Sequence, residues 1–168
     1  MVKILSGLFI VCFCCRQPGF IQVWRQAYNQ DGSRLAAVVA PKYGRWTVAV
    51  DGKAWGTVFK DMVIDPTWSP DGSRLAAVGK NGRHWHLIVD DKLWQQRFAM
   101  VWSPVFSPAG DVVAAKVEVD GGYTLAVNDR LWSRRCEAVW DPVFSPGGDK
   151  LLVKTIEDGT YYRRVLPV

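Results

Sequence analysis

Two histidines are the side chains of this sequence best suited to acid–base chemistry or metal binding. His84 and His86 are its only histidines, and Trp85 separates them. In an extended segment alternate side chains share a face, so both imidazoles would point to one side. No third ligand lies nearby to complete a metal site, and no serine or cysteine nucleophile motif accompanies the pair. We therefore interpret the histidines as polar strand residues, and we assign no catalytic residue and no metal site.

The cysteines and aspartates give no stronger indication of chemistry. Cys12, Cys14 and Cys15 cluster without the second ligand pair that a zinc site requires, and Cys136 stands alone. Six aspartates recur in predicted turns, where the side chain can bond its own following backbone. They are Asp31, Asp51, Asp71, Asp90, Asp91 and Asp129. No phosphate-binding loop, dinucleotide-binding motif or haem attachment motif is present, so we predict no cofactor and no enzymatic activity.

Aromatic and basic side chains are the remaining candidates for binding. The 168 residues include nine tryptophans and carry a net charge of +5. Aromatics mixed with basic residues can stack on single-stranded nucleic acid, but here they recur in register, as core packing requires. We therefore predict no nucleic-acid partner. Trp24, Trp102 and Trp140 lie near the junctions between repeats, and with Arg134 and Arg135 they are the candidate partner-binding residues.

An internal repeat of about 40 residues must position these side chains. Its turns are Asn29-Gln30-Asp31-Gly32, Ser69-Pro70-Asp71-Gly72, Ser107-Pro108-Ala109-Gly110 and Ser145-Pro146-Gly147-Gly148. Their last glycines are 40, 38 and 38 residues apart. Four columns recur around the turns: Tyr28, Trp68, Phe106 and Phe144; Trp46, Trp85, Tyr123 and Tyr161; Trp55, Trp94 and Trp132; and Trp24, Ile64, Trp102 and Trp140. A period of this length, with glycine and aromatic residues at fixed positions, indicates a repeat architecture.

Each repeat is predicted to form four short antiparallel strands. In the second unit, extended segments at 67–69, 74–78, 84–89 and 93–101 are separated by turn residues. One such sheet has the size and strand number of a β-propeller blade. The sequence therefore predicts an all-β propeller of about four four-stranded blades with WD40-like repeats.

The predicted domain organisation has an apolar leader followed by the propeller. The apolar stretch from Ile4 to Cys15 has twelve residues, too few to span a bilayer, and we expect residues 1–19 to be a poorly structured or non-native leader. A degenerate export or anchoring segment and an inward-packing strand are the alternatives. Residues 20–168 form the repeats, at approximately 24–63, 64–101, 102–139 and 140–168. The strand at residues 20–24 could complete the last blade and close a four-bladed ring. A fragment of a larger propeller, or two chains in a ring of eight blades, are the alternatives.

Two resemblances add to this interpretation. The segment from Trp68 to Ala77, Trp-Ser-Pro-Asp-Gly-Ser-Arg-Leu-Ala-Ala, resembles the WD40-like (PD40) repeat of TolB-like propellers. The repeated Val-x-x-x-x-Trp hairpins and Ser-Pro-Asp-Gly turns, from residue 20 onward, are similar to the tryptophan-rich subunits (TmcD) of a transmembrane electron-transfer complex. This is the Tmc complex of sulfate-reducing bacteria.

The second resemblance implies a cofactor-free accessory subunit on the cytoplasmic side of the inner membrane. Its partners would be iron–sulfur, cytochrome b-type and multihaem cytochrome subunits, so membrane association would be indirect. A homodimer is an additional expected assembly. The alternatives are a periplasmic TolB-like propeller that binds a peptide or protein, and a propeller domain associated with a hydrolase.

Overall fold

The computed structural model describes residues 19–102 and 104–168, which form four antiparallel β-sheets and no helix. The first sheet contains β1 (Gln22–Tyr28), β2 (Leu35–Lys42), β3 (Arg45–Val50) and β4 (Lys53–Ala54), and the second contains β5 (Met62–Trp68), β6 (Leu75–Asn81), β7 (His84–Val89) and β8 (Lys92–Leu93). The third contains β9 (Met100–Val101), β10 (Val105–Phe106), β11 (Val113–Val119), β12 (Gly122–Val127) and β13 (Arg130–Leu131). The fourth contains β14 (Ala138–Val139), β15 (Val143–Phe144), β16 (Lys150–Glu157) and β17 (Thr160–Pro167). The predicted all-β architecture of four small sheets is confirmed.

The predicted turns form as the sequence indicates. The amide of Gly72 donates to the carbonyl of Ser69 at 2.9 Å, and the corresponding bond closes each of the other three turns. Gly72 has a φ of +70°, which a residue without a Cβ adopts at little cost. The hydroxyl of Ser69 accepts from the amide of Arg74 at 2.9 Å, which holds the end of the turn against the start of β6. These bonds explain why serine and glycine recur at fixed positions.

The first strand of every sheet is interrupted directly after the column that contains Trp24. In the first sheet the register shifts at Arg25, with a φ of +36°, and in the second it shifts at Asp65 and Pro66. In the third and fourth sheets the strand divides before Pro104 and Pro142, so that β9 and β10 both pair with β11, and β14 and β15 both pair with β16. Pro66, Pro104 and Pro142 lack the N–H that a ladder bond requires, which favours an interruption at these places in the second, third and fourth sheets.

The apolar core lies between successive sheets. We call the side of each sheet that points along the row toward the fourth-sheet end its trailing face. The side that points toward the first-sheet end is its leading face. Between the first and second sheets, Val38 and Val48 of the trailing face pack with Ala77 and Ile88 of the leading face. Equivalent clusters join the second sheet to the third and the third to the fourth. Because strand side chains alternate, residues of both faces are buried, and the central strands are almost continuously apolar.

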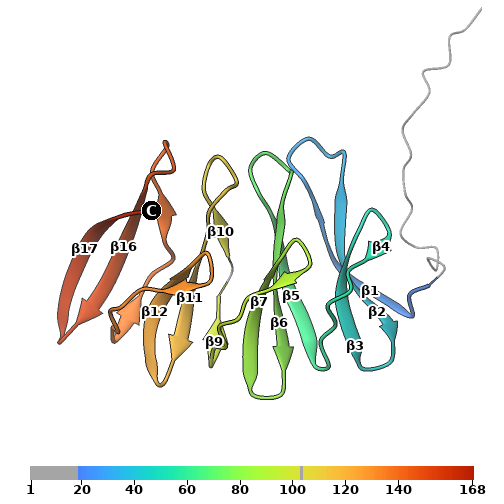
Figure 1. Ribbon diagram of the computed structural model, residues 1–168, viewed down its shortest axis with the longest axis horizontal. Helices are drawn as coiled ribbons and strands as arrows, with labels where there is room; N and C mark the ends of the chain where they lie inside the picture. The colour runs from blue at the N-terminus through green and yellow to red at the C-terminus, as the bar shows by residue number, and fades with distance from the viewer. Residues whose placement is uncertain (1–18, 103) are drawn as a thin grey trace, which may run out of the picture.

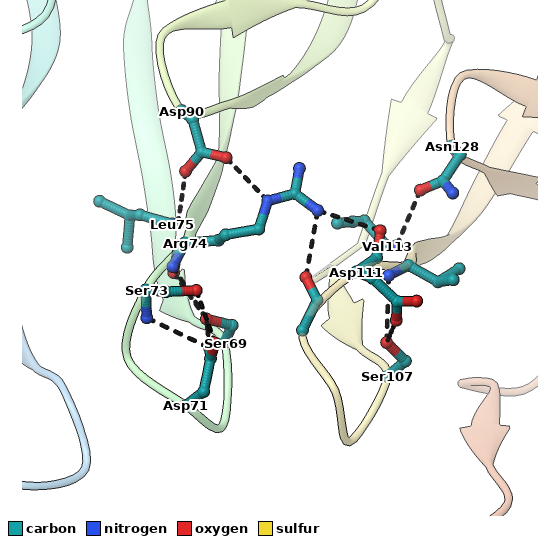
Figure 2. A network of polar contacts seen from close by, with 12 residues as sticks. Ser69, Asp71, Ser73, Arg74, Leu75, Asp90, Ser107, Asp111, Val113 and Asn128 are labelled. Atoms are coloured by element: carbon teal, nitrogen blue, oxygen red, sulfur yellow. Dashed lines mark hydrogen bonds and ion pairs between the residues drawn. The ribbon is translucent and has the colours of Figure 1, made fainter. Parts of the chain in front are cut away.

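Polar contacts also bridge the sheets near the turns. Figure 2 shows the guanidinium of Arg74 between the second and third sheets, where it reaches Asp90 and the carbonyls of Gly110 and Asp111. The same carboxylate of Asp90 accepts from the amide of Leu75 at 2.9 Å. Arginine therefore ties its own turn, its own hairpin and the following turn together.

The four sheets lie side by side in chain order, with the first and last at opposite ends of the row (Figure 1). The predicted closure of the ring by residues 20–24 is wrong, because this strand belongs to the first sheet. Val23 pairs with Val39 and Trp24 with Val38, both in β2. The physical reason is local: Phe20 and Val23 pack on buried Ala37 and Val39 of the leading face.

The sheets occupy residues 22–54, 62–93, 100–131 and 138–167, against predicted repeats at 24–63, 64–101, 102–139 and 140–168. The predicted leader, apart from Gly19, lies outside the described residues, and so do Cys12, Cys14 and Cys15. In the described part of the chain, no helix has the length and apolar character needed to cross a membrane.

Candidate partner-binding surface

An aromatic pair recurs on the trailing face of three sheets. Each pair joins the column that contains Trp24 to an aromatic on a later strand of the same sheet: β3 in the first sheet, β12 in the third and β17 in the fourth. The ring centroids of Trp24 and Trp46 are 5.6 Å apart, those of Trp102 and Tyr123 are 5.7 Å apart, and those of Trp140 and Tyr161 are 5.8 Å apart. In the second sheet Ile64 replaces the first aromatic, and Trp85 is buried in the core. Two columns recognised in the sequence therefore meet in space.

The three candidate tryptophans differ in their exposure to solvent. Trp24 is 61% exposed and Trp140 is 42% exposed, whereas Trp102 is half-buried. Trp102 also lies under the ammonium group of Lys116, with Nζ 4.2 Å from the ring centroid. Trp24 and Trp140 are thus the candidates whose rings an external group can reach most readily.

The trailing face of the fourth sheet is open. Leu151 and Val153 point to the third sheet and are buried, so the alternate residue Leu152 points away from it. Leu152 pairs with Val143 on one side and Val165 on the other, and these three side chains are 36%, 54% and 63% exposed. Trp140 and Tyr161 extend the same surface. An apolar face of this kind is typical of a protein interaction site.

The positions of the third sheet that correspond to this open face are covered by the fourth sheet. Val105, Tyr123 and Val127 there pack in the cluster between the third and fourth sheets. The open face of the fourth sheet therefore has the composition of a surface that another sheet covers.

Two cations lie within this open face. Lys154 pairs directly with Arg163 across β16 and β17, an arrangement of like charges that destabilises a sheet. Arg163 donates to the hydroxyl of Tyr161 at 3.3 Å and lies 5.8 Å from its ring centroid. Among the described residues, no carboxylate forms an ion pair with either cation.

The candidate arginines lie apart from this face, after β13. Arg134 pairs with Glu157 at 3.3 Å, and Arg135 pairs with Asp120 at 2.7 Å. Glu157 also accepts from Arg164, and this hydrogen bond lowers the pKa of the Glu157 carboxyl. Both candidate arginines are exposed but already paired, and exposed pairs exchange partners at little cost in free energy.

The two histidines lie in different surroundings. His84 is exposed, whereas His86 is buried and lies 6.2 Å from the ring of Phe59. Burial, and secondarily the charge of Arg97, lowers the pKa of His86. Within residues 19–102 and 104–168, no three His, Cys, Asp or Glu side chains are grouped so that they could hold a metal ion.

One further column of the repeat was not recognised in the sequence. Phe59 and Phe98 are almost fully buried. Phe59 forms an isolated β-bridge with Trp46, and Phe98 forms one with Trp85. Cys136 takes the same place in the third sheet, where burial raises the pKa of its thiol. The signal was a spacing of four residues before Trp102 and Trp140 and five before Ile64.

Comparisons with known proteins identify the fold. Over 88% of this chain, TolB from Acinetobacter baumannii superimposes with a TM-score of 0.51 at 16% sequence identity. The β-propeller domain of the Trilobed protease from Pyrococcus furiosus gives a TM-score of 0.51 over 89% of this chain at 14% identity. The Dos1 propeller gives 0.53 over 82% at 9% identity.

The chain has the β-propeller fold. It spans 41%, 59% and 42% of the length of these three structures, so the four sheets correspond to part of each matched protein. No protein-family model matches the sequence, and no curated protein matches it. At these identities the similarity establishes the fold, including its likeness to TolB-like and other WD40-type propellers.

Proposed function

We propose that this propeller is a non-catalytic protein-interaction module that docks a partner subunit on the open trailing face of its fourth sheet. The observation that carries the proposal is the exposed row of Val143, Leu152 and Val165 beside Trp140 and Tyr161. Aromatic and aliphatic side chains clustered on one open face are typical of interaction hot spots.

The charges on the face define the partner further. Lys154 and Arg163 lie side by side, so a carboxylate from the partner would relieve their repulsion. The partner surface is therefore apolar at its centre and carries acidic groups opposite these two cations. Binding should weaken with added salt, since exposed charges are screened over about 8 Å at physiological ionic strength.

We further propose that the partner belongs to a membrane-bound electron-transfer complex, in which this chain is a cytoplasmic accessory subunit. The support is the resemblance of the repeated hairpins, from Val50 to Trp55 and at the two equivalent positions, to the Tmc subunit. A cofactor-free subunit would contribute assembly, and it would contact iron–sulfur or cytochrome subunits.

A periplasmic role in peptide or protein binding is the alternative. The structural similarity to TolB from Acinetobacter baumannii favours it, although this similarity concerns the fold. Determining the N-terminus of the cellular protein distinguishes the two locations. Removal of the residues before Phe20 by a secretory peptidase would contradict the cytoplasmic proposal.

The test is affinity capture of the tagged full chain from detergent-solubilised membranes of its source, measured by mass spectrometry and haem absorbance. We expect cytochrome and iron–sulfur subunits to co-purify, and Val165→Asp to reduce their recovery at least tenfold. Tyr43→Ala is the control, because Tyr43 is 96% exposed in the turn between β2 and β3, away from the open face. Equal recovery with both variants would exclude the fourth sheet as the docking face. Recovery of the chain without these subunits would contradict the electron-transfer role.

A further inference from the structure

The aromatic pair of the third sheet already contains a cation. The ammonium nitrogen of Lys116 lies 4.2 Å from the ring centroid of Trp102 and 5.5 Å from that of Tyr123. Both distances are within the range in which a ring attracts a cation. This pair of rings, one directly after β9 and the other on β12, therefore binds an alkylammonium group supplied by β11, which lies between them.

The pair in the first sheet has the same geometry. The centroids of Trp24 and Trp46 are 5.6 Å apart at an interplanar angle of 60°, against 5.7 Å and 60° for Trp102 and Tyr123. The amide of Trp102 donates to the carbonyl of Lys116, and Trp24 pairs with Val38 in the corresponding register. Val38 thus occupies the position from which Lys116 extends its ammonium group in the third sheet.

The aromatic site of the first sheet is accessible and lacks an internal cation. Trp24 is 61% exposed, Trp46 is half-buried, and Val38 beneath them is 1% exposed. Across the described residues, no lysine or arginine lies over the ring of Trp24 or Trp46. In the other sheets the site is altered, because Ile64 replaces the tryptophan of the second, and Arg163 already lies 5.8 Å from the ring centroid of Tyr161 in the fourth.

We infer that Trp24 and Trp46 form a binding site for the ammonium group of a lysine side chain on a partner protein. The third sheet supplies the reason for preferring lysine, since the occupant of the same ring geometry there is an ammonium group on a four-carbon stem. The inference rests on the proposed function in one respect, namely that the lysine belongs to a partner protein. The recognition chemistry does not depend on the open face of the fourth sheet.

The probe is Nα-acetyl-lysine amide, titrated into the ¹⁵N-labelled full chain while the indole N–H signals are followed by NMR. Trp24→Leu assigns the signal of Trp24, and Nα-acetyl-norleucine amide is the uncharged control of the same stem length. We expect the Trp24 signal to shift with an affinity about two- to fivefold higher for the lysine probe, as an exposed cation–π contact provides. Equal affinity for both probes would overturn the inference.

Two reciprocal substitutions test the site without any partner. Val38→Lys should supply an internal ammonium group and abolish the response of Trp24 to the probe. Lys116→Val should vacate the third-sheet pair and create a new response at Trp102. If the lysine at buried position 38 prevents folding, Lys116→Val still decides, because failure to create a response at Trp102 contradicts the inference. Since both readouts use a small probe, their failure is distinguishable from a failure to capture partner subunits.

Discussion

Arg74 Nε donates to Asp90 Oδ2 at 2.8 Å, and the other end of the same guanidinium crosses to the next sheet (Figure 2). Nη1 of Arg74 reaches the carbonyls of Gly110 and Asp111 at 3.1 and 3.0 Å. Arg34 pairs with Asp51 in the same way in the first sheet, at 3.1 Å. The third sheet lacks this pair, because Val112 and Asn128 stand at the corresponding positions. The contact between the second and third sheets therefore depends on arginine more than the contact that follows it.

Arg74→Met should remove this bridge while retaining much of the aliphatic stem. We expect the free energy of unfolding to fall by about 1–2 kcal/mol, since bonds to a charged donor are lost at a half-buried position. Urea unfolding measured by circular dichroism gives the value. Arg83→Met is the matched control, because Arg83 is exposed in the turn between β6 and β7, and its effect should lie within about 0.5 kcal/mol. An equal effect of the two substitutions would show that the bridge contributes nothing.

Gly79 is required by the close approach of Phe59 from the first sheet. A Cβ at position 79 would overlap the phenyl ring of Phe59. Phe59 is 1% exposed and cannot move into solvent without opening the core. Gly79→Ala should therefore lower the free energy of unfolding by about 1–3 kcal/mol, as overpacking of a core does.

A second substitution tests the cause of that loss. Phe59→Leu in the Gly79→Ala background shortens the side chain that meets the new methyl group. We expect the double variant to be more stable than the sum of the two single effects predicts, as measured by a double-mutant cycle in urea. Simple additivity would mean that the methyl group clashes with something other than Phe59.

Asp71 gives the fold a dependence on acid pH. The hydroxyl groups of Ser69 and Ser73, and then the amide of Ser73, donate to this carboxylate and lower its pKa from 3.8 to about 2. Because the folded-state pKa is the lower one, the charged form stabilises the fold fully above pH 3.8, and this contribution is lost as the pH falls toward 2. Unfolding should be followed for the wild type and Asp71→Asn between pH 6 and 2. The difference in stability should narrow as the pH falls through this range; a constant difference would contradict the prediction.

The sequence predicted the turns and the sheet type because these depend on local chemistry. Ser69 and Gly72 act within one turn, and the alternation of buried and exposed side chains needs only strand geometry. The in-register aromatics also predicted that most tryptophans contribute to the core. Trp85 and Trp94 are buried, and four further tryptophans are partly buried against the core clusters: Trp46, Trp55, Trp68 and Trp132.

The rest depends on contacts between side chains of different strands, which the repeat pattern does not specify. Trp24 pairs with Val38 because Phe20 and Val23 pack on apolar side chains of the first sheet. The repeat pattern alone does not show which sheet this strand joins. Likewise, Trp24 and Trp102 occupy one column but differ in exposure because their surroundings differ. Lys116 covers the second ring, and Val38 leaves the first uncovered.

Trp102 and Trp140 should therefore respond differently to truncation, although their sequence contexts are similar. Trp102 is half-buried between Tyr123 and Lys116, so Trp102→Ala should lower the free energy of unfolding by about 2 kcal/mol, below the range for a fully buried tryptophan. Trp140 is 42% exposed on the open face, and Trp140→Ala should lower it by about 1 kcal/mol or less. Both variants should retain the circular dichroism of a β-sheet protein, and urea unfolding with unchanged m-values should give the two costs. If Trp140→Ala proves as destabilising as Trp102→Ala, the trailing face of the fourth sheet is part of the folded core and cannot be the surface that a partner covers.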